Sequence, residues 1–340
     1  MKFALISTHG IHKARVKLDC NTGDCTSFIN WLDIWSGFHF NYTELRKEDI
    51  SYLKDFDVVM MSGHLNHISD IINIAKFLKD SNTVSMFYPE GSVQLYDNSI
   101  RGFHREYYDA WKACDIISMA EEDKASYYKS FVEPETLVRF IHVPISREME
   151  AGSWFKNRRL KSPVSLVYGD NNPNHPLVAV AASKRCGLEV FAVECGEKET
   201  IEQIKEVTGH PKITATSKLS QNTFLHNLGR SIIHFYPTEW HGTAREVIAC
   251  AAVGTPCIGS NQSHTQMRLF PELACNIYDV DRMAELGTRL LMDADYYQLI
   301  ANRAFERVQF YNLANTKKRF TDAWEEAKEK KLAKQGLATA

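Results

Sequence analysis

Short apolar runs alternate with longer segments of helical period along the whole chain, and this alternation limits the possible folds more than any other feature. The run VVMM within residues 57–61 has no polar residue, as in a strand that is buried on both faces. Alternating strands and helices are typical of parallel sheets with helices on both faces. The sequence therefore predicts an α/β fold.

The expected elements fall into two series. Strands of the first series are expected at 3–7, 57–61, 83–87, 115–119 and 137–143, with helices at 26–38, 68–78, 105–113 and 123–131. Strands of the second are expected at 164–168, 188–193, 212–215, 231–236, 255–259 and 276–279, with helices at 176–186, 200–208, 223–228 and 243–253 and further helix over 281–311 and 316–334. A chain of 340 residues has room for two such domains. We expect two Rossmann-like, doubly wound parallel-sheet domains that face one another across a cleft, followed by C-terminal helices.

Composition changes suggest where these domains begin and end. Residues 1–150 form the first expected domain, and a polar, basic stretch at 151–162 is the expected linker. Residues 163–311 form the second domain, and 312–340 are expected to be a helical tail that packs back on the first. Basic side chains in the linker are Lys156, Arg158, Arg159 and Lys161.

Charge and cysteine usage narrow the class of protein. A net charge of −2 gives no global attraction to nucleic acid or to an anionic membrane. No apolar run approaches the roughly 18 residues that span a bilayer. Eight cysteines lie mostly in apolar segments without a CxxC pair, which indicates reduced core residues. These features predict a cytoplasmic protein without a transmembrane segment.

Ligands of open parallel sheets bind beyond the carboxyl ends of the strands, so functional residues are expected in the loops that follow strands. In the first domain these positions are His9, Gly10, His64 and Glu90. Candidates in the second domain include Gly169, Asn171 and Lys218.

Residues 231–260 carry the most informative pattern: a strand, a polar loop, a helix of small apolar residues, a Gly-x-Pro stop and another strand. A helix N-terminus offers backbone N–H groups and a partial positive charge, so Gly242, Thr243 and Ala244 are expected to cradle a diphosphate. Arg245 is expected to add a charged hydrogen bond to the phosphate, and Glu246 to accept from ribose hydroxyls.

This segment resembles the donor-binding core of glycosyltransferases of the two-domain GT-B fold, most of all the retaining family 4. Glu239 stands for the first glutamate of the family pattern, His241 with Gly242 and Thr243 for its turn, Glu246 for its second glutamate, and 252–256 for its end. Here six residues separate the two glutamates, where the family has seven. The resemblance implies transfer of a sugar from a nucleotide-diphosphate sugar, with a UDP-sugar favoured, to an acceptor hydroxyl. It further implies retention of configuration, no metal and no other cofactor.

The resemblance also suggests roles for individual residues. The family places a His near the transferring sugar, and His64 is the candidate here. Glu90 is expected to orient or deprotonate the acceptor hydroxyl, and Glu239 to hold sugar hydroxyls. The family follows the first strand of its second domain with an Arg and a Lys for the diphosphate, but this chain has 169–175 (GDNNPNH) there. Lys218, Arg230 and Arg245 are the candidates to supply the missing positive charge, and hydrogen bonds from the asparagines are the alternative.

Two other functions stay open beside a transferase for a saccharide, lipid or small-molecule acceptor. One is a phage-type glucosyltransferase that acts on hydroxymethylated DNA bases, with the basic linker as its phosphate contact. The other is a nucleotide-sugar epimerase or a non-catalytic nucleotide-sugar binder on the same fold. Asp293 and Asp295 imitate a metal-binding DxD, but they lie in a segment of helical period and are interpreted as a surface coincidence.

Overall fold

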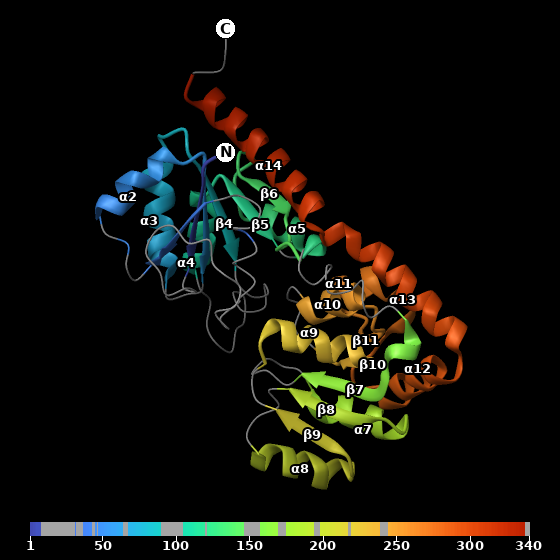
Figure 1. Cartoon of the computed structure of the whole chain (residues 1–340). Coiled ribbons are helices and arrows are strands. Elements are labelled where there is room, and N and C mark those ends of the chain that lie inside the picture. Colours follow the sequence, from blue (N-terminus) through green and yellow to red (C-terminus); the bar gives the residue numbers. More distant parts are fainter. Residues whose placement is uncertain are drawn as a thin grey trace. The chain divides into compact units, whose positions relative to one another are not determined.

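The computed structural model describes residues 1–7, 31, 37–42, 45, 47–63, 67–89, 105–119, 121–145, 157–168, 175–193, 198–216, 219–238 and 244–336. The chain divides into two compact units, Met1–Pro144 with Leu313–Ala340, and Ile145–Asn312. Each unit is built on one six-stranded parallel sheet flanked by helices (Figure 1). This confirms the expected α/β fold with two Rossmann-like sheets. The cleft between the domains and the four-part division of the chain stay predictions.

The sheet of the first unit has the strand order β2-β1-β3-β4-β5-β6. Its strands are β1 (Phe3–Ser7), β2 (Phe38–Asn41), β3 (Val58–Gly63), β4 (Val84–Pro89), β5 (Ile116–Met119) and β6 (Leu137–Phe140). Its helices are α2 (Lys47–Tyr52), α3 (Ile68–Leu78), α4 (Arg105–Ala113), α5 (Ala125–Lys129) and α14 (Leu313–Lys334), with short 3-10 turns at Leu53–Asp55 and Glu122–Lys124.

Strand β2 was not expected, and its first residue, Phe38, was assigned to the end of a helix. A four-residue strand is too short for its period to be recognised. Its place is decided by parallel pairing with β1, in which Ala4 lies opposite Phe38 and Ser7 opposite Asn41. This strand is therefore determined by its pairing with β1 and not by a pattern in its own sequence.

Successive side chains of a strand point to opposite sides of the sheet, and in this sheet both sides are buried. Ala4 and Ile6 pack in one apolar cluster with residues of α3 and α4. Phe3 and Leu5 pack in a second cluster on the other face, together with Phe320 of α14. Helices α3 and α4 thus cover one face of this sheet, and the C-terminal helix α14 covers the other.

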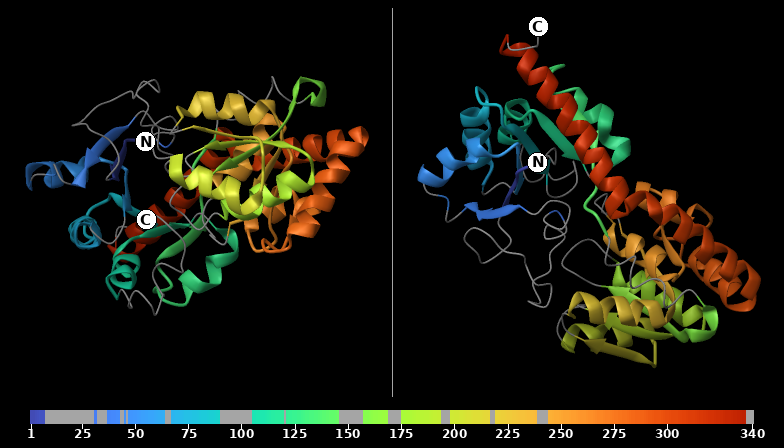
Figure 2. Two further views of the ribbon diagram at one scale, coloured as in Figure 1. Left: turned by 90° about the horizontal axis from the view of Figure 1, so that it is seen from below. Right: turned by 45° about the horizontal axis from the view of Figure 1, so that its top comes forward.

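The long helix α14 is the cover of the second face. It lies beside β4, β5 and β6, and the red helix can be followed along the cyan and green strands in Figures 1 and 2. The Phe320 ring meets the Phe3 ring edge-on, with centroids 5.6 Å apart. The Lys331 ammonium is buried and donates to the carbonyls of Leu78 and Thr83 at 2.9 and 2.7 Å. The C-terminal helix is therefore part of the first unit's core.

The sheet of the second unit has the order β12-β11-β10-β7-β8-β9. Its strands are β7 (Ser162–Tyr168), β8 (Glu189–Val193), β9 (Ile213–Thr216), β10 (Ser231–Tyr236), β11 (Cys257–Ser260) and β12 (Ala274–Cys275). Its helices are α7 (Pro176–Arg185), α8 (Lys198–Thr208), α9 (Gln221–Arg230), α10 (Arg245–Val253), α11 (His264–Leu269), α12 (Val280–Met292) and α13 (Ala294–Val308), with 3-10 turns at Arg158–Leu160, Pro271–Leu273 and Gln309–Tyr311.

Two helical layers cover this second sheet. Contacts join α9, α11 and α13 to α10 in one layer, and α8 and α12 to α7 in the other (Figure 1). The expected Gly-x-Pro stop is confirmed, because Gly254 ends α10 in the left-handed conformation with φ 70°. Helix α11 was not expected, and β12 begins two residues earlier than predicted.

Among the described residues no helix combines the length and the apolar character needed to cross a membrane.

Candidate functional site

The second sheet reverses its strand order between β7 and β10. From β7 the chain proceeds outward through β8 and β9, and from β10 it proceeds outward on the other side through β11 and β12. Loops that leave adjacent strands in opposite directions open a crevice at the carboxyl ends of those strands, which is where ligands of such sheets bind. The topology therefore points to the segments that follow β7 and β10.

Backbone contacts bring these segments together. The His175 N–H, just before α7, donates to the carbonyl of Pro237, just after β10, at 3.0 Å. The His175 ring also lies against the Tyr278 ring, with centroids 5.3 Å apart. Helices α7 and α10 both begin at this edge, so two positive helix ends lie at the carboxyl ends of β7 and β10.

Ala244 has a special backbone conformation at the start of α10. Its φ of 43° and ψ of 49° are left-handed, and within the described chain it is the one non-glycine residue with positive φ. Such a conformation costs about 1–3 kcal/mol and clusters at ligand sites. The helix begins at Arg245, two residues later than expected, and the N–H groups of Val247 and Ile248 donate to the Ala244 carbonyl. Ala244 is thus the cap of this helix.

Glu246 lies in the first turn of α10, as expected, and interacts with a residue that sequence reasoning missed. The Tyr236 hydroxyl, at the end of β10, hydrogen-bonds the Glu246 carboxylate. Burial, and then the nearby Glu246 charge, raise the pKa of Tyr236 well above its ordinary value of 10. Tyr236 therefore stays a hydroxyl donor that orients Glu246. Its position as the last residue of the strand was the available signal.

The other predicted donor-side residues lie outside the described residues: Gly169, Asn171, Lys218, Glu239, His241, Gly242 and Thr243. Gly169 and Asn171 follow β7, and 239–243 follow β10, so the adjoining strands are those of the crevice. Lys218 follows β9, which is the edge strand and is separated from β7 by β8.

Two of the cations considered for the diphosphate, Arg230 and Arg245, lie at opposite edges of the second sheet. Arg230 ends α9 immediately before β10, so it lies at the amino end of that strand. Ligands bind at the opposite edge, and the suggestion that Arg230 serves the diphosphate is wrong. Arg245 begins α10 at the carboxyl edge and is the candidate that fits.

The first unit has its own reversal of strand order, between β1 and β3. His9 and Gly10 follow β1, His64 follows β3, and Glu90 follows β4 directly. All four lie outside the described residues, so their assignments stay predictions.

Glu121, which sequence reasoning also missed, follows β5 in this unit. Its side chain is buried, and Oε1 has no hydrogen-bond partner within the described part of the chain. Burial raises its pKa to about 7, against an opposing effect of Lys124. A carboxyl group of this kind is able to exchange a proton near neutral pH.

Two basic residues of the expected linker are engaged within the second unit. The Arg158 guanidinium donates to the carbonyl of Leu291 at 2.6 Å. The Lys161 ammonium donates to Thr255 Oγ1 at 2.8 Å, and burial lowers its pKa to about 7. These side chains hold their own fold together, which leaves less of the linker for contacts with DNA phosphates.

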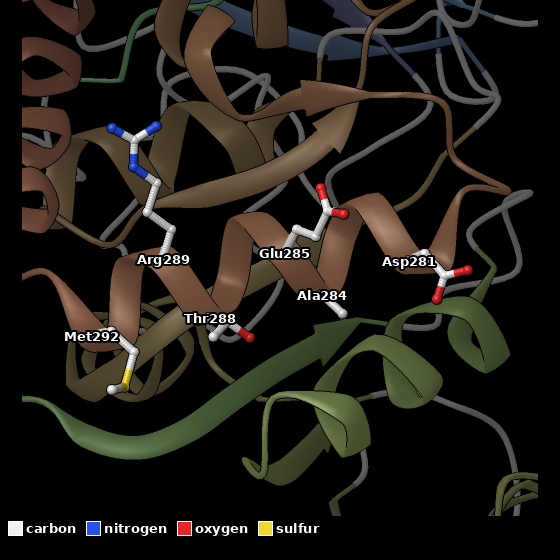
Figure 3. Close-up of a pocket in the computed structure, with 6 residues that line it drawn as sticks. All are labelled: Asp281, Ala284, Glu285, Thr288, Arg289 and Met292. Atoms are coloured by element: carbon white, nitrogen blue, oxygen red, sulfur yellow. The ribbon is translucent and has the colours of Figure 1, made fainter.

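A pocket of about 620 Å³ lies on the second unit, and none of the predicted site residues lines it. Figure 3 shows its six lining side chains, which spread to both sides of the single helix α12: Asp281, Ala284, Glu285, Thr288, Arg289 and Met292. Its two carboxylates have partners in the chain, since Asp281 pairs with Arg185 and Glu285 with Arg282. The Arg289 guanidinium lies over the Tyr296 ring, 3.7 Å from its centroid. We interpret this pocket as an open trough on the helix surface.

Asp293 and Asp295, which imitate a DxD motif, lie at the start of helix α13. The Asp293 carboxylate caps α13 by accepting from the Tyr296 N–H at 2.8 Å, and Asp295 lies in the first turn. Both carboxylates sit where they complement a helix dipole.

Two parallel, doubly wound sheets with a long C-terminal helix define the GT-B fold of glycosyltransferases. No protein-family model matches the sequence, and no curated protein matches it either. Solved structures do match. Sucrose-phosphate synthase from Thermosynechococcus elongatus superposes with a TM-score of 0.68 at 12% identity, over 100% of both chains. The α,α-trehalose 6-phosphate synthase of Burkholderia multivorans gives 0.69 at 9% identity, over 99% of this chain and 100% of its own.

TarM of S. aureus, solved with UDP, gives a TM-score of 0.63 at 10% identity. The alignment covers 81% of this chain but only 58% of TarM. At such identities the likeness establishes the fold, and the expected GT-B architecture is confirmed. Family 4 is a narrower assignment that the comparisons leave as a prediction.

Proposed function

We propose that this protein is a glycosyltransferase that binds a nucleotide-diphosphate sugar at the crevice between β7 and β10. The proposal is supported by a fold shared with nucleotide-sugar enzymes and by TarM, which has been solved with UDP. The observation that carries it is the start of α10. There a strained Ala244, the cation of Arg245 and a carboxylate held by Tyr236 lie at the carboxyl edge of a topological switch point.

The chemistry of each group fits this role. The diphosphate is placed at the N-terminus of α10, where the helix dipole and Arg245 stabilise negative charge. Glu246 accepts hydrogen bonds from the ribose hydroxyls, and the Tyr236 hydroxyl fixes its rotamer. A UDP-sugar is our favoured donor.

Transfer then proceeds by a simple exchange of bonds. The acceptor oxygen bonds to C1 of the sugar, on the face that the diphosphate leaves, while the bond from C1 to the diphosphate breaks. The proton of the acceptor hydroxyl passes to Glu90, and the leaving group takes up negative charge. We assign stabilisation of that charge to α10 and Arg245, without a metal at the diphosphate. His64 near the sugar, Glu90 near the acceptor hydroxyl and Glu239 on the sugar hydroxyls complete the proposal, together with retention of configuration.

The alternatives receive less support. The DNA-modifying function needs a free basic linker, but Arg158 and Lys161 are engaged within the second unit. An epimerase or a non-catalytic nucleotide-sugar binder is distinguished from a transferase by experiment, because either would bind the nucleotide without transferring a sugar to an acceptor.

The first experiment is a thermal-shift screen of the full chain against UDP, GDP, ADP, CMP and their common sugars. A ligand at about 100 times its dissociation constant adds roughly 2.7 kcal/mol to the free energy of unfolding, which raises the melting temperature measurably. We expect a uridine nucleotide to stabilise the wild type and to lose that effect in Glu246→Ala.

A matched control is Glu206→Ala, which removes an exposed glutamate from α8. It should keep the full nucleotide response. If no nucleotide stabilises the wild type, the proposed function is wrong. If Glu206→Ala and Glu246→Ala lose the response equally, the site at α10 is wrong.

A further inference from the structure

A compact group of metal-ligating side chains lies beneath α10 in the core of the second unit. His234 comes from β10, Cys250 from α10 and Cys257 from β11, and all three are fully buried. One potential ligand atom from each lies within 4.8 Å of the other two. Sequence reasoning treated these cysteines as ordinary core residues and did not consider His234.

The His234 ring is held as a metal-binding imidazole usually is. Its Nδ1–H donates to the Leu166 carbonyl at 2.8 Å, which fixes the ring orientation and the tautomer. Nε2 is buried and has no hydrogen-bond partner within the described part of the chain. Burial lowers the pKa of His234 to about 4, so the ring is neutral at pH 7. A buried acceptor nitrogen without a partner is costly, and it needs an explanation.

The two sulfurs complete the set. Both cysteines are free thiols, and a hydrogen bond joins their side chains. Burial, above all, raises the pKa of Cys250 well above its ordinary value of 9 in the unmetallated chain. A bound dication reverses that preference, because a thiolate coordinated to metal is deprotonated outright.

We propose that His234, Cys250 and Cys257 bind one Zn²⁺ ion. Imidazole and thiolate are common ligands of zinc in proteins. A set of three protein ligands leaves the fourth tetrahedral position to a non-protein ligand such as water. Charge decides between the soft metals that accept this set. Zn²⁺ with two thiolates is neutral, whereas Cu⁺ would leave a net negative charge in a fully buried core.

The ion would join three elements that the fold keeps separate in sequence. It ties α10 to β10 and β11 just below the helix turn that carries Arg245 and Glu246. The site is in the core and is distinct from the diphosphate position, where we propose no metal. Binding releases both thiol protons, so zinc retention should fall as the pH is lowered.

Zinc content of the full chain tests the proposal. The protein is refolded with ZnCl₂, freed of loose metal by gel filtration and analysed by elemental mass spectrometry. We expect about one zinc per wild-type chain and less than a tenth of that in Cys250→Ser and Cys257→Ser. Cys186→Ser is the matched control, because this partly buried cysteine of the same unit hydrogen-bonds Ala284 and Thr288 of α12 and is not one of the three proposed ligands. It should retain the zinc.

A second measurement needs no variant. The wild type refolded with Co²⁺ should show the near-ultraviolet absorption of a thiolate bound to cobalt. A folded wild type that holds neither zinc nor cobalt would overturn the proposal, as would copper in place of zinc. A disulfide between Cys250 and Cys257 in the refolded protein would overturn it as well.

Discussion

Tyr236 and Glu246 show how a single hydrogen bond prepares the proposed donor site. Tyr236→Phe removes the hydroxyl that orients the carboxylate but keeps the buried ring. A hydrogen bond to a charged group contributes about 1.5 kcal/mol, so we expect roughly a tenfold weaker binding of the nucleotide. Titration calorimetry with the ligand that the screen identifies would measure it. Unchanged affinity in Tyr236→Phe would show that Glu246 needs no such support.

Glu121 gives a prediction of pH dependence at the same scale. Its pKa of about 7 in the folded chain exceeds the ordinary value of 4.5, so the folded state keeps a proton that the unfolded chain releases. The stability that this contributes is complete below pH 4.5 and is lost as the pH rises through 7. Glu121→Gln has no such loss. Between pH 4.5 and about pH 8, the free energy of unfolding of Glu121→Gln should therefore increase by roughly 2–3 kcal/mol relative to that of the wild type.

Urea unfolding across this pH range measures the difference. Exposed Glu122→Gln is the control and should follow the wild type. A parallel pH profile for Glu121→Gln and wild type would mean that the Glu121 carboxyl is ionised in the folded chain.

At the scale of elements, one buried ammonium is among the contacts that hold α14 on the first unit. Lys331 Nζ lies 3.0 Å from the Asp115 carboxylate and donates to two backbone carbonyls. Lys331→Met leaves that carboxylate and both carbonyls without this donor. We expect a loss of about 2–4 kcal/mol in the free energy of unfolding.

Its neighbour Lys330 is the natural control. Lys330 is exposed and pairs with Glu326 on the same helix at 3.6 Å. Lys330→Met should cost only about 0.3–0.5 kcal/mol. Chemical denaturation of both variants decides the matter, and equal losses would show that Lys331 acts only as a surface charge.

At the scale of the whole molecule, the two units differ in how the chain builds them. The second unit, Ile145–Asn312, is continuous, whereas the first needs Leu313–Ala340 to cover one sheet face. We expect residues 145–312 to fold alone with a cooperative thermal transition. Residues 1–144 alone should expose the face of Phe3 and Leu5 and aggregate.

A peptide of residues 313–340 supplied in trans should restore the first fragment. Circular dichroism and gel filtration of the three preparations test this, and a monomeric, cooperatively unfolding fragment 1–144 would contradict it.

By itself the sequence determined the two series of elements, because the periods of strands and helices are local. It placed β1, α3, α4 and β10 with their observed bounds, and the Gly254 stop of α10. It also identified the start of α10 as the candidate site, since a helix N-terminus after a strand is readable from neighbouring residues.

Only the tertiary structure decided which segments meet. Four features join residues of separate elements: the pairing of β2, the switch in strand order between β7 and β10, the bond from Tyr236 to Glu246 and the grouping of His234 with two cysteines. Arg230 was kept as a diphosphate candidate for the same reason, because only the strand direction shows that it lies at the opposite edge. Periodicity describes the faces of one element, whereas a site depends on pairing and packing between elements.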